Sequence, residues 1–197
     1  MNAKLSYDER KQLLAARLKP SRFRHSLGVA ETAAQLAARF GVDAEAARTA
    51  GLLHDCAREF PNEAMRAEAD KRQIPYGPIE RAMPLLLHAY LGAARVRELY
   101  GVDDDAISQA IYRHTVGGPQ MTRLDKIIWY ADMIEPSRDY PEVEMLRRPA
   151  REASLDEMLL AGLTESIKFV AAKGHLLHPR TIEARNELLL RGVKLPV

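Results

Sequence analysis

The chain has 197 residues, 47% of them hydrophobic, which is enough for one packed domain and excludes an intrinsically disordered chain. Its 29 basic and 27 acidic residues leave a formal net charge of only +2, so the composition indicates no nucleic-acid partner. The single cysteine, Cys56, excludes a disulfide within the chain, and no apolar run approaches the roughly 20 residues that span a bilayer. Because the first residues also lack a signal-peptide pattern, we expect a cytoplasmic protein with no membrane partner.

Helical periodicity and capping residues predict the elements in the first third of the chain. Ser6 and Glu9 have the spacing of a capping box, and Pro20 ends the helix that they begin. The helices expected next cover residues 21–39, residues 43–57 with Asp43 as the cap, and a short stretch from Pro61.

Prolines and glycines divide the rest of the chain. Three prolines and a glycine within residues 74–84 predict a loop, and Gly117-Gly118-Pro119 predicts a break. Pro136 and Pro141 bracket a turn. The helices expected between and after these segments cover residues 85–99, 103–114, 122–134, 154–173 and 179–190, with Asp103, Thr122 and Ser154 as caps and Pro179 opening the last.

The pattern as a whole predicts an all-α fold. We find no β-hairpin signature and no internal repeat, and the connections are short, so a single compact helical bundle is expected. The apolar face of residues 155–170 is interpreted either as part of the core or as the interface of a homodimer.

Residue types that ligate metals recur inside or beside the apolar helical segments. They are His25, the His54-Asp55 pair that ends AGLLHD, His88 in PLLLHAYLGA, His114 in AIYRHTVGG and Asp132 in LDKIIWYADMIEP. One histidine on an apolar helix is more often an ordinary core residue. Burial of the whole set is costly unless a partner neutralises it, and a divalent cation pairs with several of them at once. Nitrogen and oxygen donors of this kind suit iron, manganese, zinc or nickel.

The order of these residues resembles that of the HD-domain metal-dependent phosphohydrolases. Within that superfamily the chain is similar to the YqeK-type bacterial family, which hydrolyses diadenosine tetraphosphate symmetrically into two ADP. The resemblance covers about residues 20–190 and is most specific in HTVGG followed by LDKIIWYADMIEPSR. It implies a nucleotide substrate. We expect residues 1–20 to be a helix packed on the core, residues 21–153 to be the HD metal-binding core, and residues 154–197 to be helices that complete the same domain.

The resemblance also implies a dinuclear centre, commonly of iron. Carried over by position, one metal ion would be held by His25, His54, Asp55 and Asp132. The second ion would be held by His88 and His114, with Asp55 bridging the two. Hydroxide activated by the metal ions would then attack a phosphorus atom of the substrate.

Asp55 and Arg58 are the expected catalytic residues. The family often has lysine at the position of Arg58, and its turn often reads HTTG where this chain has Val116. Arginine keeps the charge and can bind phosphate in a bidentate manner, although it is a poorer proton donor. The expected substrate contacts are Arg24, Thr115, Gly117, Lys126 and Arg138, for each of which a plain structural or surface role is the alternative.

Two other functions stay open at this point. The chain could be an HD phosphohydrolase that acts on nucleoside monophosphates or cyclic dinucleotides, or a metal-bound regulatory module without turnover. The intact set of ligand residues favours an enzyme over the module.

Overall fold

The computed structural model describes residues 5–196, which contain helices and turns and no β-strand. Eleven α-helices occur in this part of the chain, so the predicted all-α fold is confirmed. They are α1 (Tyr7–Ala15), α2 (Pro20–Phe40), α3 (Ala44–Leu53), α4 (Asn62–Lys71), α5 (Pro78–Ala82), α6 (Leu87–Tyr100), α7 (Asp105–Arg113), α8 (Arg123–Ile134), α9 (Val143–Glu152), α10 (Leu155–Ala172) and α11 (Pro179–Leu190). Two 3₁₀ turns, η1 (Cys56–Glu59) and η2 (Pro84–Leu86), lie between them.

Several helices begin at the predicted capping residues. Ser6 and Glu9 form a capping box at α1, Asp43 caps α3, and Ser154 caps α10. A capping box at Thr122 opens α8. Each cap satisfies backbone N–H groups that would otherwise lack a partner at the helix end, which explains why short polar residues locate these starts.

Other boundaries were predicted wrongly. The third helix ends at Leu53 rather than near residue 57, and α7 is capped by Asp104 rather than Asp103. The stretch 74–84, predicted as a loop, contains the short helix α5. Helix α9 was not predicted at all, because it contains Pro149 and follows a proline-rich turn. Burial of one apolar face of α9 stabilises it despite the proline.

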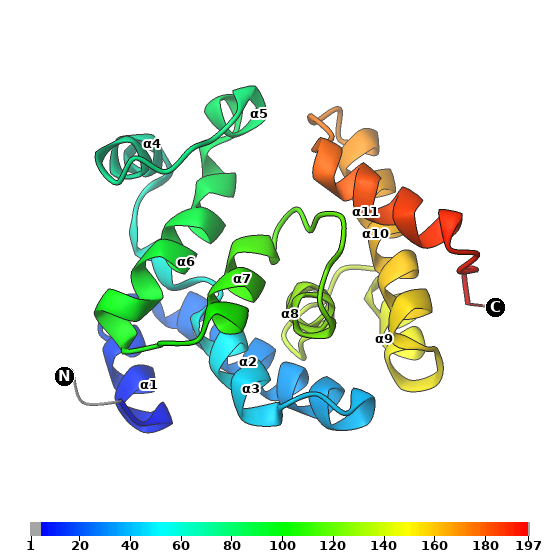
Figure 1. The fold of residues 1–197 in the computed structure, drawn as a ribbon, viewed down its shortest axis with the longest axis horizontal. Coiled ribbons are helices and arrows are strands. Elements are labelled where there is room, and N and C mark those ends of the chain that lie inside the picture. Colours follow the sequence, from blue (N-terminus) through cyan, green and yellow to red (C-terminus); the bar gives the residue numbers. More distant parts are fainter. Residues whose placement is uncertain (1–4, 197) are drawn as a thin grey trace.

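The larger of the two hydrophobic cores in the described residues extends from Leu14 in α1 to Leu188 in α11, and the smaller joins α4 and α6. Figure 1 shows how these helices are arranged. Helices α2 and α3 pack against each other along one side of the molecule, and α7 and α8 pack on them. The first half of α10 is buried against α8, α9 and α11 within this chain. The homodimer and the division at residues 20–21 and 153–154 stay predictions, and residues 1–4 and 197 of the predicted terminal segments lie outside the described part. None of the helices within residues 5–196 combines the length and apolar character that crossing a membrane requires.

A close backbone contact between α2 and α3 positions two of the clustered histidines, His25 and His54. A Cβ atom at Gly51 would lie 2.8 Å from the Cα of Ala30 and 3.0 Å from its backbone nitrogen. Only glycine permits this contact, since backbone atoms cannot move aside as a flexible side chain can. Gly51 is one helical turn before His54, so the contact sets how close His54 comes to His25 on α2.

We therefore predict that Gly51→Ala destabilises the protein. Alanine favours a helix more than glycine by up to about 1 kcal/mol, but the clash with Ala30 should outweigh this and lower the free energy of unfolding by about 1–3 kcal/mol. Chemical denaturation measures the change, with Ala38→Ser at an exposed site of α2 as the control. An unchanged or higher denaturation midpoint for Gly51→Ala would contradict the prediction.

Candidate metal centre

The six candidate metal ligands lie together in one largely buried cluster. His54 and His114 are the C-terminal caps of α3 and α7, and Asp55 follows His54 directly. The other three lie within helices, His25 in α2, His88 in the first turn of α6, and Asp132 in α8. Three overlapping groups within the cluster have ligand atoms within 4.8 Å of one another: His25–His54–Asp55, His54–His114–Asp132 and Asp55–His88–His114.

Each histidine ring is oriented by a hydrogen bond from its Nδ1. His54 donates to the carbonyl of Gly51 (2.7 Å), His88 to that of Leu85 (2.5 Å) and His114 to that of Ile111 (2.7 Å). In all three the acceptor lies three residues earlier in the chain. Because a carbonyl oxygen only accepts, Nδ1 must carry the proton in these rings, and in the neutral ring Nε2 then offers a lone pair.

The Nε2 atoms point toward one another across the cluster. Those of His25 and His54 are 3.2 Å apart, and those of His88 and His114 are 3.0 Å apart. Burial and the neighbouring His88 and His54 lower the pKa of His114 to about 3, so this ring is neutral near pH 7. Facing lone pairs at this separation repel unless a cation lies between them. The donor set therefore fits a divalent metal ion.

Asp55 presents its two oxygens to different histidine pairs. Its Oδ2 lies 3.8 Å from Nε2 of His25 and 3.5 Å from that of His54. Its Oδ1 lies 3.1 Å from Nε2 of His88 and 3.8 Å from that of His114. A carboxylate in this position can contribute to two groups of ligands at once.

Asp132 completes the first of these groups. Its Oδ1 is 2.9 Å from Nε2 of His25 and 3.8 Å from Nε2 of His54. Burial raises the pKa of Asp132, but the hydrogen bond with His25 and the charges of His54 and Arg138 lower it far more. Burial likewise raises the pKa of Asp55, while His54 and His88 hold it well below the ordinary value. Both carboxylates are therefore ionised, as metal ligands must be.

Nearby groups that resemble ligands lie outside the cluster. The thiol of Cys56 is directed to the carbonyl of Gly92 (3.9 Å), and burial raises its pKa to about 12, so it is not a thiolate ligand. His178 caps α11 and bonds the carboxylate of Glu80 (3.0 Å), and His175 is exposed.

The predicted substrate contacts divide into two groups. Arg138 reaches the cluster, since its Nη2 bonds Oδ1 of Asp132 at 2.5 Å, and Arg58 interacts electrostatically with Asp55 and Asp132. Lys126 instead pairs with Asp156 of α10 at 2.5 Å. Arg24 is exposed, and within residues 5–196 its side chain forms no hydrogen bond or ion pair.

Thr115 and Gly117 follow His114 in the turn before α8. The hydroxyl oxygen of Thr115 is buried without a hydrogen-bond partner among the described residues, and its carbonyl accepts a bond from Trp129 (3.1 Å). Gly117 has φ +67°, a conformation that favours glycine.

Two residues beside the ligands were missed in the sequence. Nη1 of Arg22 is 2.8 Å from Oδ2 of Asp55, and Oε1 of Glu135 is 3.0 Å from Nδ1 of His25. Arg22 lies three residues before His25, and Glu135 lies three residues after Asp132, so each shares a helix face with a ligand. That spacing could have indicated both.

Comparison with known proteins places this arrangement in a family. Residues 22–137, which span all six ligand residues, match the model of the HD domain. The chain belongs to the HD domain family. It is 37% identical to a symmetrical bis(5'-nucleosyl)-tetraphosphatase of Halalkalibacterium halodurans, over 91% of this chain and 95% of that protein, and thus belongs to the same family as that tetraphosphatase.

Two further relatives cover most of this HD-domain chain. A symmetrical bis(5'-nucleosyl)-tetraphosphatase of Bacillus subtilis is 37% identical over 85% of this chain and 89% of its own length. A crystal structure from Clostridium acetobutylicum, described as a predicted HD superfamily hydrolase involved in NAD metabolism, is 41% identical with a TM-score of 0.90. It is matched over 96% of this chain and 100% of that one, so the fold of this chain is that of an HD hydrolase.

Glu135→Gln should weaken metal binding by about 10- to 100-fold, because the neutral amide no longer supports the imidazole of His25 as a carboxylate does. A competition titration with a metal-binding dye measures the affinity. Glu63→Gln, at an exposed carboxylate of α4, is the control. Equal affinity in the Glu135 variant and the control would show that Glu135 does not orient the ligand.

Metal affinity should also fall as the pH is lowered from about 8 to about 6. Burial lowers the pKa of His54, but the carboxylates of Asp55 and Asp132 raise it above the ordinary value of about 6.5 overall. As the pH drops through this raised pKa, a proton occupies Nε2 and competes with the metal ion. Metal titrations at a series of pH values test this. An affinity that stays constant down to pH 6 would contradict it.

Proposed function

We propose that this chain hydrolyses diadenosine tetraphosphate, and related dinucleoside polyphosphates, symmetrically to two ADP. The family supports the reaction, because relatives that cover nearly the whole chain are symmetrical tetraphosphatases. The observation that carries the chemistry is the position of Asp55, whose two oxygens face two different histidine pairs.

This geometry supports a centre for two ions. His25, His54 and Asp132 would hold one ion together with Oδ2 of Asp55, and His88 and His114 would hold the other with Oδ1 of Asp55. Bound ions would supply Lewis acidity and an activated water. Iron is the favoured metal by resemblance to the family, with manganese, zinc and nickel as alternatives that suit the same donors.

Three arginines of the chain would neutralise the tetraphosphate. Arg22, Arg58 and Arg138 are partly exposed and lie beside the buried carboxylates Asp55 and Asp132. If metal ions take the carboxylate oxygens, the guanidinium groups are free to bind phosphate in a bidentate manner. Arg58 would act at the reacting phosphate by stabilising the charge that develops there.

The turn after His114 offers further contacts. The unpartnered hydroxyl of Thr115 would donate to a phosphate oxygen. Gly117 is a weaker candidate, because its N–H already donates to the carbonyl of Arg113 (2.9 Å). Lys126 and Arg24 are weaker candidates, because the first is paired with Asp156 and the second is exposed with no contact to the ligand residues.

Product analysis tests the proposal. The metal-loaded protein should convert diadenosine tetraphosphate to ADP alone, and Asp55→Ala should lose both bound metal and activity. Formation of ATP and AMP would contradict symmetrical cleavage. Turnover of a nucleoside monophosphate or a cyclic dinucleotide in its place would support the other HD phosphohydrolase functions. If metal is retained but none of these substrates is hydrolysed, the regulatory module is favoured.

A pair of variants on one helix tests the phosphate contacts. We expect Arg22→Ala to raise KM for the tetraphosphate by about tenfold or more, because a charge-assisted hydrogen bond is lost, and Arg22→Lys to restore part of the affinity. Arg24→Ala, two residues away and exposed, should change KM less than about twofold. Steady-state kinetics give both values. The reverse order of effects would assign the contact to Arg24.

A further inference from the structure

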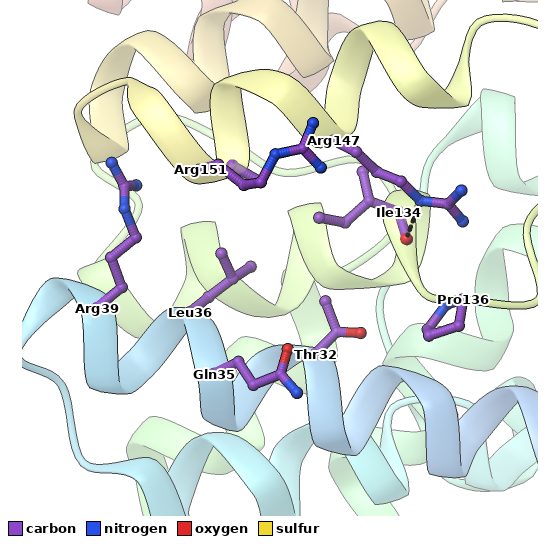
Figure 2. A pocket seen from close by; sticks show the side chains of 9 residues that line it. Thr32, Gln35, Leu36, Arg39, Ile134, Pro136, Arg147 and Arg151 are labelled. Atoms are coloured by element: carbon purple, nitrogen blue, oxygen red, sulfur yellow. Dashed lines mark hydrogen bonds between the residues drawn. The ribbon is translucent and has the colours of Figure 1, made fainter.

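A cavity lies between α2 and α9, about two to four helical turns from His25 along α2. It has a volume of about 600 Å³, within the range of about 300–1,000 Å³ that is usual for small-molecule sites. Figure 2 shows Leu36 of α2 and Ile134 of α8 between the two helices. We call this cavity the arginine groove, after the three arginines in its lining: Arg39, Arg147 and Arg151.

Two of the three arginines that line the arginine groove have no acidic partner among the described residues. No acidic residue lines the groove within the described part of the chain. Arg39 and Arg151 are exposed, and within residues 5–196 neither forms an ion pair with a carboxylate. Arg39 uses one donor on the carbonyl of Ala153 (2.6 Å) and keeps the others. Arg147 is paired with Glu144 (2.6 Å), so the guanidinium groups of Arg39 and Arg151 give the groove its positive charge and favour an anion as the ligand.

The other residues of the lining indicate which class of anion fits the groove. Leu36, Ile134, Pro136 and Ala150 give the arginine groove an apolar floor, which a simple inorganic anion would leave uncovered. A molecule with a flat ring and a phosphate chain satisfies both parts, with the ring on the floor and the phosphates on the guanidinium groups.

We propose that the arginine groove is a second binding site, distinct from the metal centre, for a nucleotide of the nucleoside diphosphate class. Arg39 and Arg151 bind the phosphates, and the apolar floor takes the base.

The arginine groove is connected to the metal centre through Arg147. Its Nε donates to the carbonyl of Ile134 (3.1 Å), and its Nη2 donates to those of Glu135 and Arg138 (both 3.0 Å). This turn carries the carboxylate that orients His25 and the guanidinium that bonds Asp132. A phosphate that attracts Arg147 competes with these carbonyls, so occupation of the groove loosens the support of two metal ligands.

Calorimetric titration with ADP tests the binding site. The wild-type protein should bind ADP at a site that is retained in Asp55→Ala, because this site does not require the metal centre. The double variant Arg39→Ala/Arg151→Ala should bind ADP at this site at least about tenfold more weakly. Arg148→Ala, on α9 but outside the groove lining and paired with Glu152, should leave ADP binding at this site unchanged. Circular dichroism checks that the variants fold, and the single variants Arg39→Gln and Arg151→Gln serve if the double variant does not.

Three results of the titration would overturn the proposal. The first is that Asp55→Ala no longer binds ADP at this site. The second is equal ADP affinity in the double variant and the wild type, and the third is that adenosine binds as tightly as ADP. None of them depends on hydrolysis, so failure of the groove and failure of the proposed activity can be distinguished.

Inhibition kinetics test the connection between the arginine groove and the metal centre, and this experiment rests on the proposed hydrolysis. ADP as the product should inhibit wild-type turnover with a non-competitive component, which the double variant loses while it keeps competitive inhibition. Purely competitive inhibition of the wild type would contradict the connection through Arg147.

Discussion

The direction of four histidine protons governs the chemistry of this molecule. Three backbone carbonyls and one carboxylate bind the Nδ1 side of the rings, so the Nε2 lone pairs are turned inward. Inside the cluster, lone pairs at 3.0–3.2 Å repel one another, and a cation between them removes this repulsion. The fold thus creates a site that is satisfied by a cation, and two ionised aspartates beside the rings set its charge.

The helical architecture produces this arrangement because two helices, α3 and α7, end at the histidine cluster. His54 and His114 terminate α3 and α7, and in each the ring bonds the carbonyl three residues back, in the last turn of the helix. The close contact of Gly51 with Ala30 then brings two of these elements together. Glu135 and Arg138, in the turn after α8, support His25 and Asp132, and Arg147 holds that turn. The candidate metal ligands, the residues that support them and the arginine groove are therefore connected.

Much of this was predictable from sequence, and the failures have physical causes. The capping residues located most helix starts, and the ordered histidines and aspartates indicated the cluster, because their chemistry is local. Helix α9 was missed because its stability comes from packing, which outweighs the effect of Pro149. The pairing of Lys126 with Asp156 joins residues 30 positions apart, which no local pattern shows. Arg22 and Glu135 were overlooked although their spacing from His25 and Asp132 was visible.

The metal content of the purified protein tests the central claim most directly. Elemental analysis after metal loading should give two divalent ions per chain in the wild type. Asp55→Ala should retain neither ion, whereas His88→Ala should keep the ion held by His25, His54 and Asp132. A wild-type protein that takes up no divalent metal would contradict the account. Identical metal content in the wild type and Asp55→Ala would show that the carboxylate between the histidine pairs does not hold the centre together.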